Sequence, residues 1–334
     1  MSESRPLLIV DGLNVSFRGR QGSFAAIEDI GFVLSSGETL AIVGESGSGK
    51  SVTSLAIMRL IPDPPGRITS GSIRFLDRDI LQLSDSDMQK LRGNDIAMIF
   101  QEPMTSLNPV MTIGNQIAEV VKLHQSATSE QARTRAIEML RLVQIPNPEQ
   151  RLSQYPHELS GGMRQRVVIA MALACSPKLL IADEPTTALD VTVQAQVLDL
   201  IRDIKSRLDT AVLLITHDLG VVAEMADRVL VLYAGRVVES APVRDLMRHP
   251  RHPYTLGLLG AMPKLRARSG GQQTRLTEIP GTVPAPAARG VGCHFADRCG
   301  YADARCRQER PPLSEKESGH SAACWHSEQL EQSR

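Results

Sequence analysis

The chain has 334 residues, of which 42% are hydrophobic and 3% aromatic, and its 37 basic and 37 acidic side chains give a formal net charge of +0. This balance, with so few aromatic rings, disfavours a nucleic-acid-binding protein, which would present basic patches or a stacking platform. No apolar stretch approaches the roughly 20 residues of a membrane-spanning helix, and the N-terminus lacks a signal-peptide pattern. We therefore expect a cytosolic protein with a sizeable core and no nucleic-acid partner.

Strand and helix patterns alternate through about the first 240 residues, which predicts an α/β domain with a largely parallel sheet. Strands are expected over residues 7–17, 24–34, 39–43, 71–75, 96–100, 179–182 and 211–216. Apolar spacing predicts a helix from the loop after residue 43 to about residue 60, and others over 113–123, 129–143, 161–174 and 191–208. Residues of about 102–174 form a predicted helical insert, in which Thr128 or Ser129 can cap the helix over 129–143. Residues 233–236 predict a hairpin turn between two last strands.

The composition changes beyond this domain. The last part of the chain is rich in Pro, Gly, Arg and Cys and has little periodicity. We therefore place a domain boundary near residue 242, with a first domain over residues 1–242 and a small, irregular extension over 243–334.

A phosphate-binding loop is predicted between the strand over residues 39–43 and the helix that follows it. The loop matches the pattern G-x-x-x-x-G-K-[ST] at every position, with Gly44, Glu45, Ser46, Gly47, Ser48, Gly49, Lys50 and Ser51. Glycines let backbone N–H groups point at phosphate oxygens, and the N-terminus of the helix favours the same negative charge. Lys50 is expected to reach the β- and γ-phosphates and Ser51 to ligate Mg²⁺.

Two carboxylates follow the apolar strand over residues 179–182. Asp183 is expected to hold Mg²⁺ through water, and Glu184 to orient and polarise the attacking water. By themselves, such acids are also typical of the solvent-exposed end of a buried strand. Beside a phosphate-binding loop they favour nucleotide hydrolysis.

A second candidate anion site lies about 20 residues before this strand, at Ser160, Gly161, Gly162 and Met163. Ser160 can cap the helix that follows, and the glycines leave its N–H groups accessible. A chain with two phosphate-binding sites uses both only if one of them acts for another molecule.

With these motifs in order, the sequence resembles the ABC ATPase family over about residues 7–242. The family's LSGGQ signature corresponds to Leu-Ser-Gly-Gly-Met at residues 159–163, which departs at Met163. The resemblance assigns Gln101 to the Q-loop glutamine, a contact to Mg²⁺ and water, and Asp190 to the D-loop. It assigns His217 to the switch histidine at the γ-phosphate. It also implies a RecA-like core, an antiparallel β subdomain and a helical insert.

The same resemblance implies how ATP is bound and used. Adenine would stack on an aromatic ring, for which Phe17 is the first candidate and Phe24 the alternative. Two cassettes would close head to tail, with each ATP between the P-loop of one and the signature of the other. Residues 102–109 lie where the family docks its membrane partner.

The extension resembles that of the dipeptide, oligopeptide and nickel permease group, in particular the first of its two paired ATPases. The matching segments are residues 252–255, 279–284, 292–293 and 298–299. This implies a peptide importer with a second, different ATPase, two permease subunits and an external binding protein, at the cytoplasmic face of the membrane. Nickel, metallophore and glutathione importers stay open as alternatives, as does a soluble ABC ATPase without a transport role.

Four of the five cysteines lie in the extension, namely Cys293, Cys299, Cys306 and Cys324. Four thiolates suit a [4Fe–4S] cluster or structural zinc, and the spacing lacks the short Cys pairs typical of zinc modules. The resemblance favours the cluster, while zinc and free structural thiols stay open. Cys175 is expected in the core, and the nearby histidines are expected in solvent: His294, His320 and His326.

Overall fold

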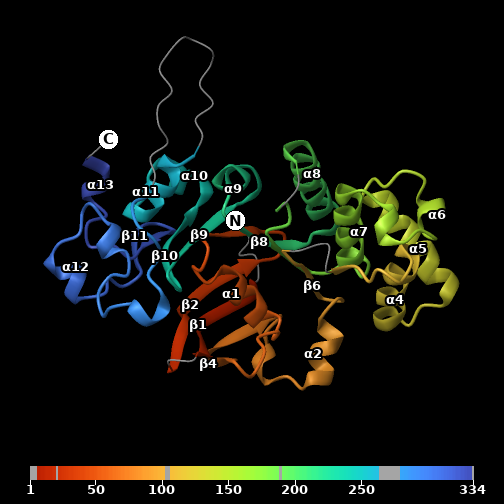
Figure 1. Ribbon diagram of the computed structural model, residues 1–334, viewed down its shortest axis with the longest axis horizontal. Helices are drawn as coiled ribbons and strands as arrows, with labels where there is room; N and C mark the ends of the chain where they lie inside the picture. Colours follow the sequence, from red (N-terminus) through yellow and green to blue (C-terminus); the bar gives the residue numbers. More distant parts are fainter. Residues whose placement is uncertain (1–5, 20–21, 102–105, 188–189, 263–278, 333–334) are drawn as a thin grey trace, which may run out of the picture. The chain divides into compact units, whose positions relative to one another are not determined.

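The computed structural model describes residues 6–19, 22–101, 106–187, 190–262 and 279–332 (Figure 1). Two compact units are found in it. One comprises Met1–Ile9, Val33–Thr39 and Arg74–Ile215 and is called the insert unit. The other comprises Val10–Phe32, Leu40–Ile73 and Thr216–Arg334 and is called the P-loop unit.

Parallel strands form the centre of the insert unit. β7 (Leu179–Asp183) lies between β6 (Ile96–Ile99) and β8 (Ala211–Thr216), and every residue of β7 and β8 is buried. Such continuous apolar strands are typical of a parallel sheet covered on both faces. The short β5 (Arg78–Asp79) pairs antiparallel with the end of β4 (Gly66–Phe75).

Helices make up the rest of the insert unit. Figure 1 shows α4 to α7 gathered together in yellow and green. The helical elements are η1 (Ile80–Gln82), α2 (Asp85–Leu91), α4 (Ile113–Gln125), α5 (Ser129–Leu142), α6 (Pro148–Arg151), η2 (Pro156–Glu158), α7 (Gly161–Leu173) and α8 (Val191–Leu208). α5 begins with the predicted cap: the Thr128 side chain accepts from the N–H of Gln131, whose own side chain accepts from the N–H of Thr128.

In the P-loop unit, β3 (Thr39–Val43) pairs in parallel with β9 (Arg228–Tyr233). The predicted hairpin turn joins β9 to β10 (Arg236–Pro242). β12 (His320–Ala322) then pairs antiparallel with β10, and β11 (Ser314–Glu317) with β12. The extension, expected to be irregular, therefore adds two strands to the edge of this sheet.

The long strands β1 (Pro6–Gly19) and β2 (Gly22–Ser35), like β4, have residues in both units. The helical elements of the P-loop unit are α1 (Lys50–Ile57), α9 (Leu219–Met225), α10 (Val243–Arg248), α11 (Pro253–Gly260), η3 (Pro286–Ala288), η4 (Ala296–Arg298), α12 (Ala304–Gln308) and α13 (Gln329–Gln332). The α/β prediction is confirmed, and α1 ends three residues earlier than expected.

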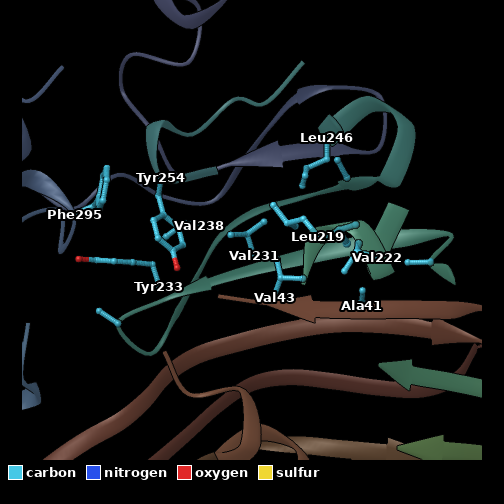
Figure 2. Close-up of a cluster of buried hydrophobic side chains, with 14 residues drawn as sticks. Ala41, Val43, Leu219, Val222, Val231, Tyr233, Val238, Leu246, Tyr254 and Phe295 are labelled. Atoms are coloured by element: carbon cyan, nitrogen blue, oxygen red, sulfur yellow. The ribbon is translucent and has the colours of Figure 1, made fainter. Parts of the chain in front are cut away.

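The core of the P-loop unit includes side chains of the extension. Figure 2 shows Tyr254 and Phe295 beside Tyr233 of β9, in one cluster with Val43 and Val231. The ring centroids lie 4.6 Å apart for Tyr233 and Tyr254, and 5.1 Å apart for Tyr233 and Phe295. These buried aromatic pairs attach the extension to the strand beside β3.

No described helix combines the length and the apolar character that crossing a lipid bilayer would require.

Candidate functional site

The phosphate-binding loop joins β3 to α1, as predicted. Gly44 has a φ of 153°, and a Cβ there would lie 2.2 Å from the carbonyl oxygen of Leu232. Gly49 has a φ of 103°, and a Cβ there would lie 2.5 Å from Ile27 Cγ2. Only glycine fits either position, so the loop backbone can stay close to its neighbours and leave room for a ligand.

Lys50 lies folded back onto this loop. Its side-chain ammonium is buried and donates to the carbonyl oxygens of Gly44 (2.7 Å) and Glu45 (3.0 Å). The N–H of Ser48 donates to the same oxygen of Glu45 over 3.2 Å. A cation is therefore held at the N-terminus of α1, where phosphate groups are favoured.

His217 is exposed directly after β8 and belongs to the P-loop unit. The following residue, Asp218, caps α9 by accepting from the N–H groups of Gly220 and Val221. The cap holds the start of α9 in place, and the adjacent imidazole faces solvent.

The two candidate adenine-stacking rings contact each other. The centroids of Phe17 and Phe24 lie 6.2 Å apart with an interplanar angle of 23°, and both side chains are half-buried. Either ring offers a face, so the choice of Phe17 over Phe24 stays a prediction.

In the insert unit, the two predicted carboxylates lie where β7 ends. Asp183 is 3% exposed. Glu184 follows with a φ of 47°, in the left-handed region, which costs of order 1 kcal/mol for a residue other than glycine. Its N–H donates to the carbonyl of Ile215 over 2.9 Å.

Gln101 and Glu184 are brought together, as their predicted roles require. Gln101 Nε2 donates to Glu184 Oε2 over 3.2 Å, and Thr187 Oγ1 donates to the same oxygen over 2.9 Å. Thr187 was not among the predicted site residues. Gln101 and Thr187 together orient one carboxylate oxygen of Glu184, as a water-polarising group requires.

The signature residues also lie in the insert unit and begin α7. Ser160 caps the helix by accepting from the N–H of Met163 over 3.4 Å. A Cβ at Gly161 would meet nothing within 4 Å, whereas one at Gly162 would lie 2.9 Å from Val193 Cγ1. The exposed start of α7 can therefore receive an anion from outside the chain.

Two further hydrogen bonds involve Asp190 and the signature helix. Asp190 caps α8 by accepting from the N–H of Val193 over 3.0 Å. Gln165 of α7 donates from Nε2 to the carbonyl of Pro185 over 2.6 Å, next to Glu184. Gln165 was not singled out from the sequence. The rest of the predicted D-loop, Ala188 and Leu189, and the predicted docking residues 102–105 lie outside the described residues.

The four cysteines of the extension line one small cavity. Burial raises the pKa of all four thiols, that of Cys324 to about 12, and the neighbouring thiolates add to the shift at Cys324. The fifth, Cys175, is buried in the insert unit, as expected.

The prediction that the nearby histidines lie in solvent is wrong. His320 is buried, with Nε2 2.7 Å from Glu239 Oε1. His294 Nε2 lies 3.0 Å from Arg310 Nη2, and His326 Nε2 lies 3.2 Å from Asp303 Oδ2. Each imidazole has a polar partner in the fold, Glu239 of β10 for His320 and residues of the extension for the other two, which the local sequence did not reveal.

Known proteins resemble the chain over nearly its whole length. The family model "ABC transporter" matches residues 27–187, and the model "Oligopeptide/dipeptide transporter, C-terminal region" matches residues 238–306. A probable peptide ABC transporter ATP-binding protein, y4tR of Sinorhizobium fredii, is 56% identical over 97% of this chain and 96% of its own length. The chain belongs to the ABC transporter family.

Further relatives agree with this assignment. The oligopeptide transport ATP-binding protein OppD of Bacillus subtilis is 54% identical over 96% of this chain and 88% of its own length. A solved dimeric ATP-binding cassette, MJ0796 with ADP and phosphate, is 27% identical with a TM-score of 0.64, over 71% of this chain and 99% of its own. This ABC ATPase is accordingly an enzyme whose site takes ATP and Mg²⁺.

Proposed function

We propose that this ABC ATPase energises the import of dipeptides or oligopeptides. The observation that carries the proposal is the match of residues 238–306 to the C-terminal region of oligopeptide and dipeptide transporters. Relatives named for peptide transport at 54% and 56% identity, over at least 96% of this chain, support it.

The roles of the predicted site residues in ATP hydrolysis follow the family resemblance. Lys50 and Ser51 would hold the β- and γ-phosphates and Mg²⁺, and Asp183 would hold Mg²⁺ through water. Glu184, oriented by Gln101, would polarise the attacking water. His217 would contact the γ-phosphate. The role of each residue is part of the proposal.

The signature would serve the ATP bound by a second cassette. The start of α7 at Gly161 is exposed and open, which suits a phosphate brought by another chain. We propose a head-to-tail dimer with a second, different ATPase. Two permease subunits and an external solute-binding protein would complete the importer, with this chain peripheral at the cytoplasmic face of the membrane.

Uptake by cells tests the transported solute. A strain that lacks the chain should lose uptake of labelled dipeptides or oligopeptides and regain it with the wild-type chain but not with Glu184→Gln. Nickel and glutathione uptake are measured in the same strains. Loss of either of those with intact peptide uptake would replace the peptide proposal with the corresponding alternative importer, and no uptake defect at all would favour an ABC ATPase outside transport.

We also propose that the four cysteines of the extension hold a [4Fe–4S] cluster. They are four buried or half-buried thiol donors that line one cavity, which fits such a cluster. Around one zinc ion, at about 2.3 Å from each sulfur, the four sulfurs would lie only about 3.8 Å apart. No three of these four sulfurs, all in the described part of the chain, lie within 4.8 Å of one another. When bound, the cluster would cross-link segments of the extension.

A second group of possible metal ligands lies in the extension. Asp303, Cys306 and His326 place one ligand atom each within 4.8 Å of the others. Their closeness also has a local cause, because Asp303 accepts from the N–H of Cys306 over 2.9 Å and pairs with His326 over 3.2 Å.

Metal and sulfide analysis after anaerobic purification decides between these donor sets. A cluster requires about four irons and four sulfides per chain. They should be lost in Cys293→Ser and kept in Cys175→Ser, which alters the thiol of the insert unit. Zinc without sulfide, lost in both Asp303→Ala and His326→Ala, would contradict the cluster and assign the site to zinc.

A further inference from the structure

The extension contacts the phosphate-binding loop at Glu45. Arg298, at the end of η4, donates from Nη1 to Glu45 Oε2 over 2.6 Å and from Nη2 to Glu45 Oε1 over 3.0 Å. The Arg298 side chain is 6% exposed and that of Glu45 is 31% exposed. A two-pronged, largely buried arginine–carboxylate pair has a defined geometry and is stronger than a surface ion pair.

A second residue of the extension holds the backbone of Glu45. The hydroxyl of Tyr254, on α11, accepts from the N–H of Glu45 over 2.8 Å. The Tyr254 side chain is fully buried against Tyr233 and Phe295 (Figure 2). The extension therefore fixes both the side chain and the peptide N–H of Glu45.

Arg298 is itself fixed from several sides. Its Nε donates to the carbonyl of Pro280 over 2.8 Å, and Nη1 donates to the Tyr233 hydroxyl over 3.3 Å. The guanidinium carbon lies 5.7 Å from the ring centroid of Tyr233 and 5.8 Å from that of Phe295. The hydrogen bond to Glu45 is the largest cause of a raised pKa at Arg298, which therefore stays charged. The guanidinium is thus held from several sides by groups of this chain.

Glu45 in turn positions the groups that face phosphate. Its carbonyl accepts from Lys50 Nζ over 3.0 Å and from the N–H of Ser48 over 3.2 Å. Arg298 also neutralises a carboxylate that lies within the loop and would repel a triphosphate. Loss of Arg298 would release Glu45 and leave its charge uncompensated beside the ligand.

We propose that Arg298 and Tyr254, together called the extension clamp, are positioning residues that set the affinity of the phosphate-binding loop for ATP. The clamp acts through Glu45 and touches no reacting atom. The inference rests on ATP as the ligand of residues 44–51. It does not depend on the transported solute or on a cluster at the cysteines.

The test measures ATP affinity and steady-state kinetics of the full chain in Arg298→Ala. We expect the Kd and KM for ATP to rise about tenfold, because the charge of Glu45 is left uncompensated beside the triphosphate, while kcat changes less than twofold. Arg298→Lys should recover part of the affinity because it keeps the charge but not the two-pronged geometry. Arg307→Ala, in the exposed pair with Asp297, is the matched control and should leave the Kd unchanged.

A double-mutant cycle with Glu45→Gln isolates the contact. If Arg298 acts through Glu45, adding Arg298→Ala to Glu45→Gln should raise the Kd less than threefold further. Tyr254→Phe removes only the hydroxyl and keeps the ring, so it provides a folded variant if Arg298→Ala does not fold. We expect it to raise the Kd about threefold, the effect of one hydrogen bond.

Several outcomes would overturn the clamp. Wild-type ATP affinity in folded Arg298→Ala would do so, and so would full additivity of the two substitutions in the cycle. Wild-type affinity in Tyr254→Phe would remove Tyr254 from the clamp. Lys50→Ala serves as the separate check on the ligand, because unchanged ATP binding in that variant would reject the phosphate loop itself rather than the clamp.

Discussion

Gln101 and Glu184 form a hydrogen bond across 3.2 Å, although 83 positions separate them in the chain. Gln101 follows β6 and Glu184 follows the neighbouring parallel strand β7, so their side chains meet at the same edge of the sheet. The Gln101 amide donates to Glu184 Oε2, and the Thr187 hydroxyl, three residues after Glu184, donates to the same oxygen. The chain's own groups therefore orient this carboxylate.

The first prediction follows from this orientation. In Glu184→Gln, kcat for ATP hydrolysis should fall about 100-fold or more, because the amide cannot accept a proton from the attacking water, while ATP binding is kept. Phosphate release and ATP binding measured in parallel check it. Glu138→Gln, in a half-exposed pair with Arg135, is the matched control. Turnover above a tenth of wild type would remove Glu184 from this role.

The second prediction contrasts the two signature glycines. Gly161→Ala should leave thermal stability unchanged or slightly raised, because the Cβ meets open space and Ala favours helices. Its ATPase activity should nevertheless fall at least about tenfold, because the methyl group would meet the phosphate of a partner's ATP.

Gly162→Ala provides the comparison in the same helix. Its Cβ would lie 2.9 Å from Val193 Cγ1, so this variant should lose stability. Melting temperature and ATPase rate are measured on both variants. Full activity in Gly161→Ala would show that no phosphate approaches this helix end.

The third prediction concerns Glu239, whose side chain is 0% exposed. Its carboxylate accepts from the N–H groups of Arg251 (2.6 Å) and His252 (3.0 Å) and lies 2.7 Å from His320 Nε2. Glu239→Ala leaves these buried donors without a partner, so the free energy of unfolding should fall by about 3 kcal/mol. Denaturant unfolding checks the value against Glu309→Ala at a solvent-exposed ion pair. A loss below about 1 kcal/mol would contradict it.

The fourth prediction is a dependence of stability on pH. Burial lowers the pKa of His252 to about 3, against about 6.5 in the unfolded chain. Between these values the unfolded chain binds a proton that the folded chain does not, so stability falls as the pH drops below about 6.5. At pH 5, this one residue should cost about 2 kcal/mol.

His252→Asn tests the origin of that slope. The His252 side chain accepts from the N–H of Tyr254 at the start of α11, a capping role that Asn can take over without titrating. Thermal unfolding between pH 7 and 5 should therefore show a flatter slope in this variant than in wild type or in His249→Asn, at an exposed position. An unchanged slope would assign the acid sensitivity to other groups.

Local patterns predicted the elements and motifs that depend on neighbouring residues. β3 and α8 have the expected bounds because each is a short periodic segment between clear loop or capping residues. Ser160 and Thr128 cap their helices as expected. The phosphate loop was readable because its glycines, lysine and serine stand side by side in the chain.

Contacts between distant segments were not readable in the same way. β12 pairs with β10, and β11 pairs with β12, through backbone hydrogen bonds. In a polar, Gly-rich tail such pairing leaves little strand pattern in the side chains. His320 was expected in solvent because a lone polar residue does not reveal its buried partner, Glu239. Thr187 was missed because its hydroxyl matters only once Glu184 is placed beside it.

Short motifs were enough to establish the family, the phosphate loop and the residue types of the hydrolytic site, because in each motif neighbouring residues act together. The contact of Arg298 with Glu45, 253 positions away, and the hold of Tyr254 on the same residue became visible in the folded chain. The residues next to Arg298 in the chain do not indicate which carboxylate it binds. The folding of the extension into the core of the P-loop unit selects Glu45, because it places the buried guanidinium beside this carboxylate.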